Sequence, residues 1–177
     1  MIKNQRRIYH LFLYILFIAF VHNLLIKGIS AQDFSSYYIL TKDGTQLATD
    51  VYKPDNNSIS KYPALLIITR YRRSIQDGKT GEPISTLSAL DKHLLASDYV
   101  LVKVDARGSG ASFGTRPTEY GKQEVLDGYD IVEWVISQNW SDGNVGAYGT
   151  SYTGTTAELL AAVNHSAVKA VIPGWSD

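Results

Sequence analysis

Three apolar runs, separated by segments with helical spacing, constrain the fold of this chain more than any other feature. The runs are ALLIITR at 64–70, YVLVKVD at 99–105 and NVGAY at 144–148. Continuous apolar runs favour strands that are buried on both faces of a parallel sheet. The segments between them, 84–97 and 120–138, repeat apolar residues every three or four positions, which indicates helices. Strands that alternate with helices predict an α/β fold, in which helices flank a mostly parallel sheet.

Further strands are expected at both ends of this pattern. Strand-like runs at 37–40 and 46–52 are joined by Asp43-Gly44, a dipeptide typical of a hairpin turn. The stretch 168–172 is a further predicted strand near the end of the sequence. In the helix predicted over 120–138, one face should carry the apolar residues Leu126, Tyr129, Val132 and Ile136.

Distinctive short segments follow three of the predicted core strands. They are TRY at 69–71, DARGSGAS at 105–112 and GTSY at 149–152. Ligands of α/β sheets bind beyond the carboxyl ends of the strands. We therefore expect these segments to converge at one edge of the sheet and to form a site there.

Ser151 lies within GAYGTSYTG, between a predicted strand and the helix expected over 155–163. A sharp turn from strand to helix is the setting of a nucleophile elbow, whose pattern is Gly-x-Ser-x-Gly. Gly149 fits this pattern, whereas position 153 is a threonine and the second glycine falls at 154. The alternative is a glycine-rich turn with an incidental serine. The place of the turn at the expected site edge favours the nucleophile.

A serine nucleophile requires a base and groups that stabilise the oxyanion. An elbow supplies one donor, the backbone N–H of the residue after the nucleophile, which here is Tyr152. A second donor is expected from the loop after the first core strand, where Tyr71 carries a phenolic hydroxyl. The alternative for Tyr71 is an ordinary surface aromatic residue.

Other polar side chains near these segments are less suited to catalysis. Asp105 and Arg107 suggest catalytic groups, but a structural ion pair is the expected role of Arg107. His93 falls inside a predicted helix, which favours a packing or surface role. His165 follows the elbow helix, and would have to reach back past that helix to meet Ser151.

The composition excludes several kinds of site. The chain has no cysteine, so disulfides and thiolate nucleophiles are impossible. Its four histidines are scattered, and neither a metal nor a cofactor is expected. Residues 32–177 contain 13 of the 17 Lys and Arg but all 17 Asp and Glu, which gives a net charge of −4. We therefore expect no nucleic-acid partner.

Residues 1–31 have the features of a secretory signal peptide. An unbroken run of 11 apolar residues, Leu11–Val21, precedes the small residue Ala31. This run is shorter than the roughly 20 residues of a membrane-spanning helix. Export to the periplasm or the exterior is therefore expected, and an uncleaved membrane anchor is the alternative. The segment begins with three basic residues, Lys3, Arg6 and Arg7.

Five sequence blocks in residues 32–177 resemble one family. They lie at 43–54, 62–71, 104–114, 127–154 and 168–177. They are similar to the CocE/NonD hydrolases, a group of α/β-hydrolase enzymes that includes cocaine esterase, α-amino-acid ester hydrolases and bacterial Xaa-Pro dipeptidyl-peptidases. In this family the elbow reads Gly-x-Ser-Tyr-x-Gly, which accounts for the late second glycine.

The resemblance implies roles for three residues. Ser151 would be the nucleophile, and the backbone N–H of Tyr152 and the hydroxyl of Tyr71 would form the oxyanion hole. The chain departs from the family at Arg70, because a proline commonly precedes this tyrosine. The departure bears on the angle at which Tyr71 enters the site.

In α/β-hydrolases the triad follows the order Ser, Asp or Glu, His. The 26 residues after Ser151 contain no suitable acid–base pair, so we expect both partners beyond residue 177. Residues 32–177 would then be the N-terminal portion of an α/β-hydrolase domain, inactive alone. The expected function is an exported serine hydrolase of small-molecule ester, amide or peptide substrates, with dipeptidyl-peptidase activity included. The alternatives are a truncated non-catalytic binding protein and another α/β-hydrolase, such as a lipase.

Overall fold

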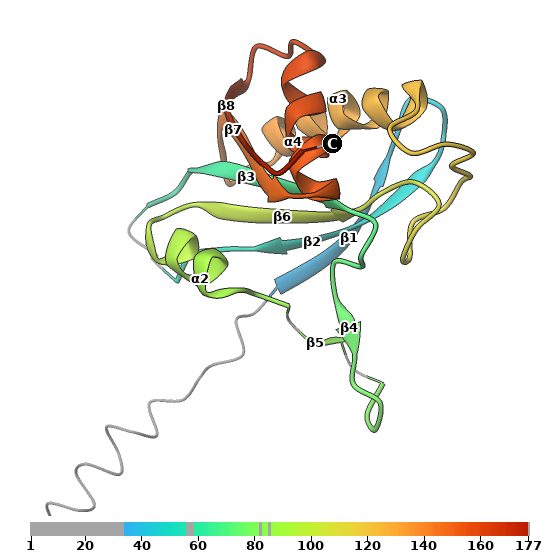
Figure 1. Cartoon of the computed structure of the whole chain (residues 1–177). Helices are drawn as coiled ribbons and strands as arrows, with labels where there is room; N and C mark the ends of the chain where they lie inside the picture. Colours follow the sequence, from blue (N-terminus) through green and yellow to red (C-terminus); the bar gives the residue numbers. More distant parts are fainter. Residues whose placement is uncertain (1–33, 56–58, 82, 85, 177) are drawn as a thin grey trace, which may run out of the picture. The chain divides into compact units, whose positions relative to one another are not determined.

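The computed structural model describes residues 34–55, 59–81, 83–84 and 86–176 (Figure 1). The signal peptide predicted over residues 1–31 lies outside the described residues. Within the described ranges, no helix combines the length and the apolar character needed to cross a membrane.

One sheet of six strands forms the centre of the described part, in the order β1-β2-β6-β3-β7-β8. β1 pairs antiparallel with β2, and β2 pairs antiparallel with β6. The remaining neighbours, β6 with β3, β3 with β7 and β7 with β8, are parallel. The predicted hairpin and the mostly parallel sheet are therefore confirmed. The strands are β1 (Phe34–Leu40), β2 (Gln46–Tyr52), β3 (Tyr62–Thr69), β6 (Val100–Asp105), β7 (Ser141–Thr150) and β8 (Val168–Gly174).

Helices cover both faces of this sheet (Figure 1). Alternate side chains of a strand point to opposite faces. In β3, Leu66 and Ile68 pack in the larger core with α3 and α4, whereas Leu65 and Ile67 line a groove beside α2. Figure 1 accordingly shows α3 and α4 above the sheet and α2 below it. The helices are α2 (Ala89–Ala96), α3 (Lys122–Ser137) and α4 (Tyr152–Ala162).

The helix predicted over 84–97 begins later than expected. Ser88 accepts a hydrogen bond from the N–H of Asp91, and the Asp91 carboxylate accepts one from the N–H of Ser88. This capping box satisfies two helix-terminal donors and fixes the start of α2 at Ala89. The residues before it form a short antiparallel ladder of β4 (Ile75–Gln76) with β5 (Pro83–Ile84).

The face predicted for the helix over 120–138 is partly wrong. Leu126 is 44% exposed, and Tyr129 and Ile136 are only half-buried. Three acidic side chains take places on the buried side because each has a partner there; Asp127, for example, is paired with Arg107. The buried residues of α3 are Glu124, Asp127, Gly128, Asp130, Ile131, Val132 and Val135.

The carboxyl ends of β3, β6 and β7 lie at one edge of the sheet. Thr69 and Asp105 are partners in the parallel register of β3 and β6, and the carbonyl of Thr69 accepts the N–H of Ala106 at 2.8 Å. From the neighbouring helix α4, the hydroxyl of Thr156 donates to the carbonyl of Ile68 at 2.9 Å. The expected convergence of the three segments is therefore confirmed.

Candidate active site

Ser151 occupies the turn between β7 and α4, as the sequence predicts. Its backbone has φ 56° and ψ −131°, a conformation that few residues with a side chain adopt. Such a conformation costs about 1–3 kcal/mol and persists only where the surroundings impose it. Here the N–H of Ser151 donates to the carbonyl of Gly174 in β8 at 2.9 Å. The side chain of Ser151 is exposed, so the strained turn presents its hydroxyl to solvent.

Two glycines permit the close packing of this turn. A Cβ at position 149 would lie 2.4 Å from the backbone of Thr153. A Cβ at position 154 would lie 2.4 Å from the carbonyl oxygen of Gly174. The second glycine of the elbow is therefore required at 154, where α4 passes β8. Position 153, where the Gly-x-Ser-x-Gly pattern has its second glycine, accommodates a threonine. The Thr153 hydroxyl donates to the carbonyl of Thr150 at 2.9 Å and accepts a hydrogen bond from the N–H of Thr150 at 2.8 Å.

Tyr152 contributes its backbone and its ring to different environments. Its N–H is among the first amides of α4, which have no acceptor inside the helix. Its side chain is 1% exposed, and its hydroxyl contacts the Glu124 carboxylate and accepts from Arg116 Nη1 at 2.8 Å. Burial, and then the hydrogen bond to Glu124, raise the pKa of the Tyr152 phenol well above its ordinary value. The ring is thus a neutral anchor, and only the N–H can serve the site.

Tyr71 lies beside this anchor, just beyond the end of β3. Its N–H donates to the Thr69 hydroxyl at 2.9 Å. The ring meets the ring of Tyr152 edge-on, with centroids 6.0 Å apart, and remains 55% exposed. The structure therefore brings Tyr71 against the residue that follows Ser151. The hydroxyl of one tyrosine and the backbone N–H of the other are the two donors predicted from the sequence.

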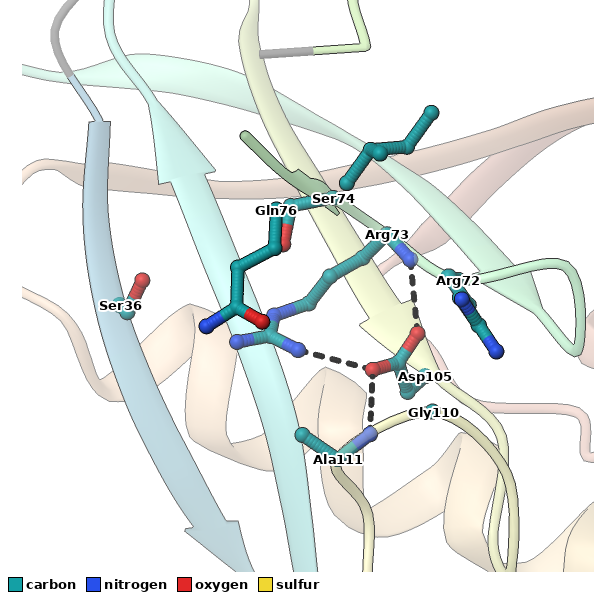
Figure 2. A pocket seen from close by; sticks show the side chains of 9 residues that line it. Ser36, Arg72, Arg73, Ser74, Gln76, Asp105, Gly110 and Ala111 are labelled. Atoms are coloured by element: carbon teal, nitrogen blue, oxygen red, sulfur yellow. Dashed lines mark hydrogen bonds and ion pairs between the residues drawn. The ribbon is translucent and has the colours of Figure 1, made fainter. Parts of the chain in front are cut away.

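Asp105 holds the loop that carries Tyr71. Its carboxylate accepts the N–H of Arg73 at 2.7 Å, Arg73 Nη1 at 2.8 Å and the N–H of Ala111 at 2.9 Å (Figure 2). A Cβ at Gly110 would lie only 2.2 Å from the same carboxylate. Asp105 is 1% exposed and lies at the wall of a cavity of about 450 Å³. These contacts make Asp105 a structural tie between the loops after β3 and β6.

Arg107 forms the structural ion pair that the sequence predicts. Its guanidinium donates to Asp127 at 2.6 and 2.9 Å, to the Thr45 hydroxyl at 2.7 Å and to Asp43 at 3.1 Å. The hydrogen bonds to Asp127 raise the pKa of Arg107, and the hydrogen bond from Arg107 holds the pKa of Asp43 well below its ordinary value. Burial raises the pKa of Asp127. Arg107 therefore ties the loop after β6 to the β1–β2 turn and to α3.

Neither of the two histidines in the described ranges is placed to act as a base for Ser151. His165 Nε2 lies 2.7 Å from Glu133 Oε1, and its Nδ1 accepts the N–H of Ala167 at 3.0 Å. The 11 residues of α4, a length of about 16 Å, separate it from Ser151. His93 lies exposed on α2. Neither ring hydrogen-bonds Ser151 within the described part of the chain.

The side chains that anchor Tyr152 were not predicted from the sequence. Tyr120 stacks on its ring with centroids 5.1 Å apart, and Arg116 and Glu124 meet its hydroxyl. The segment from 106 to 121 has no periodic pattern that would indicate these contacts. Arg70 also contacts this region, through the rings of Tyr71 and Tyr152.

Chemically, the arrangement suits attack on a carbonyl carbon. An exposed hydroxyl lies at the N-terminus of a helix, where the aligned peptide dipoles favour negative charge. The backbone N–H of Tyr152 and the phenol of Tyr71, whose ring packs on the ring of Tyr152, are groups that can donate to an oxyanion. This edge of the sheet thus combines a candidate nucleophile with candidate stabilising donors.

Comparisons with known proteins also indicate a hydrolase. The X-Pro dipeptidyl-peptidase (S15 family) profile matches residues 43–176. A Mycobacterium bovis protein whose name assigns it provisionally as a serine esterase is 41% identical over 153 residues, which are 81% of this chain and 24% of the relative. Cocaine esterase of a Rhodococcus species is 32% identical over 142 residues, which are 80% of this chain and 23% of the relative.

A solved structure shares the fold. The crystal structure of a CocE/NonD family hydrolase from Staphylococcus aureus matches with a TM-score of 0.66 and 30% identity, over 78% of this chain and 26% of that chain. The expected fold, part of an α/β-hydrolase, and the resemblance to CocE/NonD hydrolases are confirmed. This chain spans about a quarter of the length of the relatives it matches.

Proposed function

This chain belongs to the X-Pro dipeptidyl-peptidase (S15) family, and from that premise we propose that it carries the nucleophile of an exported serine hydrolase of ester or amide bonds. The observation that carries the proposal is Ser151, exposed at a strained turn where a strand meets a helix. Relatives named as esterases and as dipeptidyl-peptidases support hydrolysis of an acyl group. Esters, amides and peptides are the proposed substrate classes.

In the proposed reaction, Ser151 Oγ forms a bond to the carbonyl carbon of the substrate. The serine proton passes to a histidine base and then to the leaving alcohol or amine, as the bond to that group breaks. The Tyr152 N–H and the Tyr71 hydroxyl donate to the oxyanion in between. The oxygen of a water molecule then bonds to the acyl carbon as its proton passes to the histidine, and the bond from that carbon to Ser151 Oγ breaks as the histidine returns the proton to Oγ. We propose that the acid and the histidine come from polypeptide beyond residue 177.

The central test compares wild type with Ser151→Ala in the full-length gene product. Hydrolysis of a p-nitrophenyl ester and of a Xaa-Pro anilide is followed, together with the circular dichroism spectrum. We expect Ser151→Ala to abolish both activities and to leave the spectrum unchanged. Ser109→Ala is the matched control, because that serine lies in the loop after β6 and donates to the Ala106 carbonyl at 2.7 Å. Retained activity in Ser151→Ala would refute the proposal.

A second test uses residues 32–177 alone. Without a histidine in hydrogen-bond reach, the Ser151 hydroxyl keeps its proton and is a weak nucleophile. We expect no turnover and almost no labelling by a fluorophosphonate probe. A monodisperse monomer that labels rapidly at Ser151 would contradict the proposed downstream base. If residues 32–177 form a stable monomer, and fusion of the downstream region restores neither labelling nor turnover, a binding protein would be favoured.

Export is proposed on the basis of the sequence of residues 1–31. Mass spectrometry of the secreted or periplasmic fraction should show a mature N-terminus near Gln32. A species that retains the apolar run would instead indicate a membrane anchor.

A further inference from the structure

Arg70 links the two tyrosines of the candidate oxyanion hole. Its guanidinium carbon lies 5.1 Å from the centroid of the Tyr71 ring and 4.9 Å from that of Tyr152. Its Nη2 donates to the Tyr71 hydroxyl at 3.3 Å. A second branch of the guanidinium forms an ion pair with Glu119. One side chain therefore contacts the exposed ring, the buried ring and a carboxylate of the loop after β6.

The direction of the hydrogen bond from Arg70 decides what Tyr71 can do. A phenol has one proton to donate and also accepts through its oxygen. Arginine has only donors, so the Tyr71 oxygen must accept from Arg70, and the phenolic proton must point to another group. The positive charge also polarises the phenol and strengthens the bond that this proton makes. Arg70 thus prepares the Tyr71 hydroxyl as a donor.

The exposure of the Tyr71 ring makes this restraint useful. Its ring is 55% exposed, and among the described residues it meets the ring of Tyr152 edge-on. Arg70 adds a planar cation against the same ring, and Glu119 holds the other side of that cation. The hydrogen bond to Tyr71 raises the pKa of Arg70, which therefore stays charged throughout the range in which enzymes are assayed.

We propose that Arg70 is a positioning residue of the oxyanion hole, which holds the Tyr71 phenol against Tyr152 and directs its proton toward the oxygen of the reacting carbonyl. The inference rests on the proposed function, because it assigns Tyr71 its donor role there. It also requires that the effect of Arg70 on turnover passes through the Tyr71 hydroxyl.

The experiment measures kcat and KM for a p-nitrophenyl ester in the full-length gene product. Arg70→Met keeps a long side chain but removes the donors and the charge. We expect kcat to fall about tenfold, the size of one hydrogen bond, and KM to change less than about twofold. Arg70→Lys retains a charged donor and should recover part of the loss. The matched control is Arg72→Met, because Arg72 is an exposed arginine of the same loop, whereas the contacts with the two tyrosines described above come from Arg70.

A double-mutant cycle with Tyr71→Phe decides the route of the effect. If Arg70 acts through the Tyr71 hydroxyl, Arg70→Met should cost less than about twofold once that hydroxyl is absent. A full tenfold loss in the Tyr71→Phe background would overturn the inference and indicate a direct charge effect. An unchanged kcat in Arg70→Met, or an equal loss in Arg72→Met, would also overturn it.

Failure of the inference and failure of the proposed function are distinguishable. If the proposed function fails, Ser151→Ala and Tyr71→Phe retain activity. If only the inference fails, Ser151→Ala and Tyr71→Phe both lose activity, and Arg70→Met either keeps its kcat or loses as much in the Tyr71→Phe background as in the wild-type background. Melting temperatures of all variants identify a loss of activity that comes from unfolding. The Glu119→Gln variant keeps Arg70 and removes its tether, and should reduce kcat by less than Arg70→Met does.

Discussion

The two loops that carry the proposed site are held in different ways. The elbow around Ser151 is held mainly by neighbours in sequence: the Thr153 hydroxyl donates to the carbonyl of Thr150 and accepts the Thr150 N–H, and the carbonyl of Ser151 accepts the N–H of Thr155 at 3.0 Å. A longer-range backbone hydrogen bond joins the N–H of Ser151 to the carbonyl of Gly174 in β8. The loop around Tyr71 is fixed from a distance, by Asp105 and by Arg70 with its partner Glu119. A site can thus combine a nucleophile that is positioned by local backbone contacts with a hydrogen-bond donor that is positioned by ion pairs between distant segments. The predictions below test this difference.

The largest effect is expected where the local loop meets β8. In Gly154→Ala the new methyl group would lie 2.4 Å from the carbonyl oxygen of Gly174, and backbone cannot yield as a flexible side chain can. The elbow must open, so we expect loss of all measurable hydrolysis and a destabilisation of about 1–3 kcal/mol. Turnover and urea denaturation of the full-length gene product measure both. The control Gly78→Ala has open space around its Cβ, and an equal loss there would contradict this reason.

Loss of the Tyr71 hydroxyl should have the next largest effect. Tyr71→Phe keeps the edge-on contact with Tyr152 but removes the donor. We expect kcat to fall by about 100- to 1000-fold, the usual cost of one oxyanion donor, with the fold intact. Steady-state kinetics measure this. Tyr37→Phe is the control, because that ring packs on Trp134, and unchanged turnover in Tyr71→Phe would exclude the donor role.

Weakening the contacts of Asp105 with the Tyr71 loop should lower kcat less than removal of the Tyr71 hydroxyl does. Asp105→Asn keeps the size of the side chain but removes the charge that pairs with Arg73. We expect a loss of stability of about 3 kcal/mol, because a partly buried arginine loses one partner, and a fall in kcat of about tenfold as the Tyr71 loop loosens. Labelling of Ser151 by the fluorophosphonate probe should fall less than kcat, since the elbow is held locally. Asp55→Asn, at an exposed site, is the control.

The same difference explains what the sequence could predict. The elbow was recognisable because its determinants lie within a few residues: an apolar strand, two glycines and a helical segment. The predicted strands were also close to those observed, because buried strands are continuous apolar runs. Fold class and candidate nucleophile thus follow from local pattern and from the family blocks.

The features that were not predicted depend on specific polar contacts, some of them between residues remote in sequence. The buried face of α3 was mispredicted because Asp127, which reads as polar surface, is buried by its pairing with Arg107. The start of α2 depended on a reciprocal bond between Ser88 and Asp91 rather than on apolar spacing. The restraint of Tyr71 by Arg70 likewise requires the position of Tyr152. Hydrophobic periodicity carries no information on such charge pairs.

The smallest expected effect is that of low pH on stability. Acid should weaken the loops that are held by carboxylate charges at a higher pH than it weakens the elbow. The hydrogen bond from Arg107 holds the pKa of Asp43 below its ordinary value of 3.8, so this carboxylate stabilises the fold above pH 3.8 and loses that contribution as the pH falls through its folded pKa. Burial raises the pKa of Asp127, which has the opposite sign and changes only above pH 3.8. We therefore expect the melting temperature of wild type to fall more steeply than that of Asp43→Asn between about pH 4 and pH 2.5. Asp55→Asn should follow wild type, and parallel curves for wild type and Asp43→Asn would show that the Arg107 pair does not contribute to acid stability.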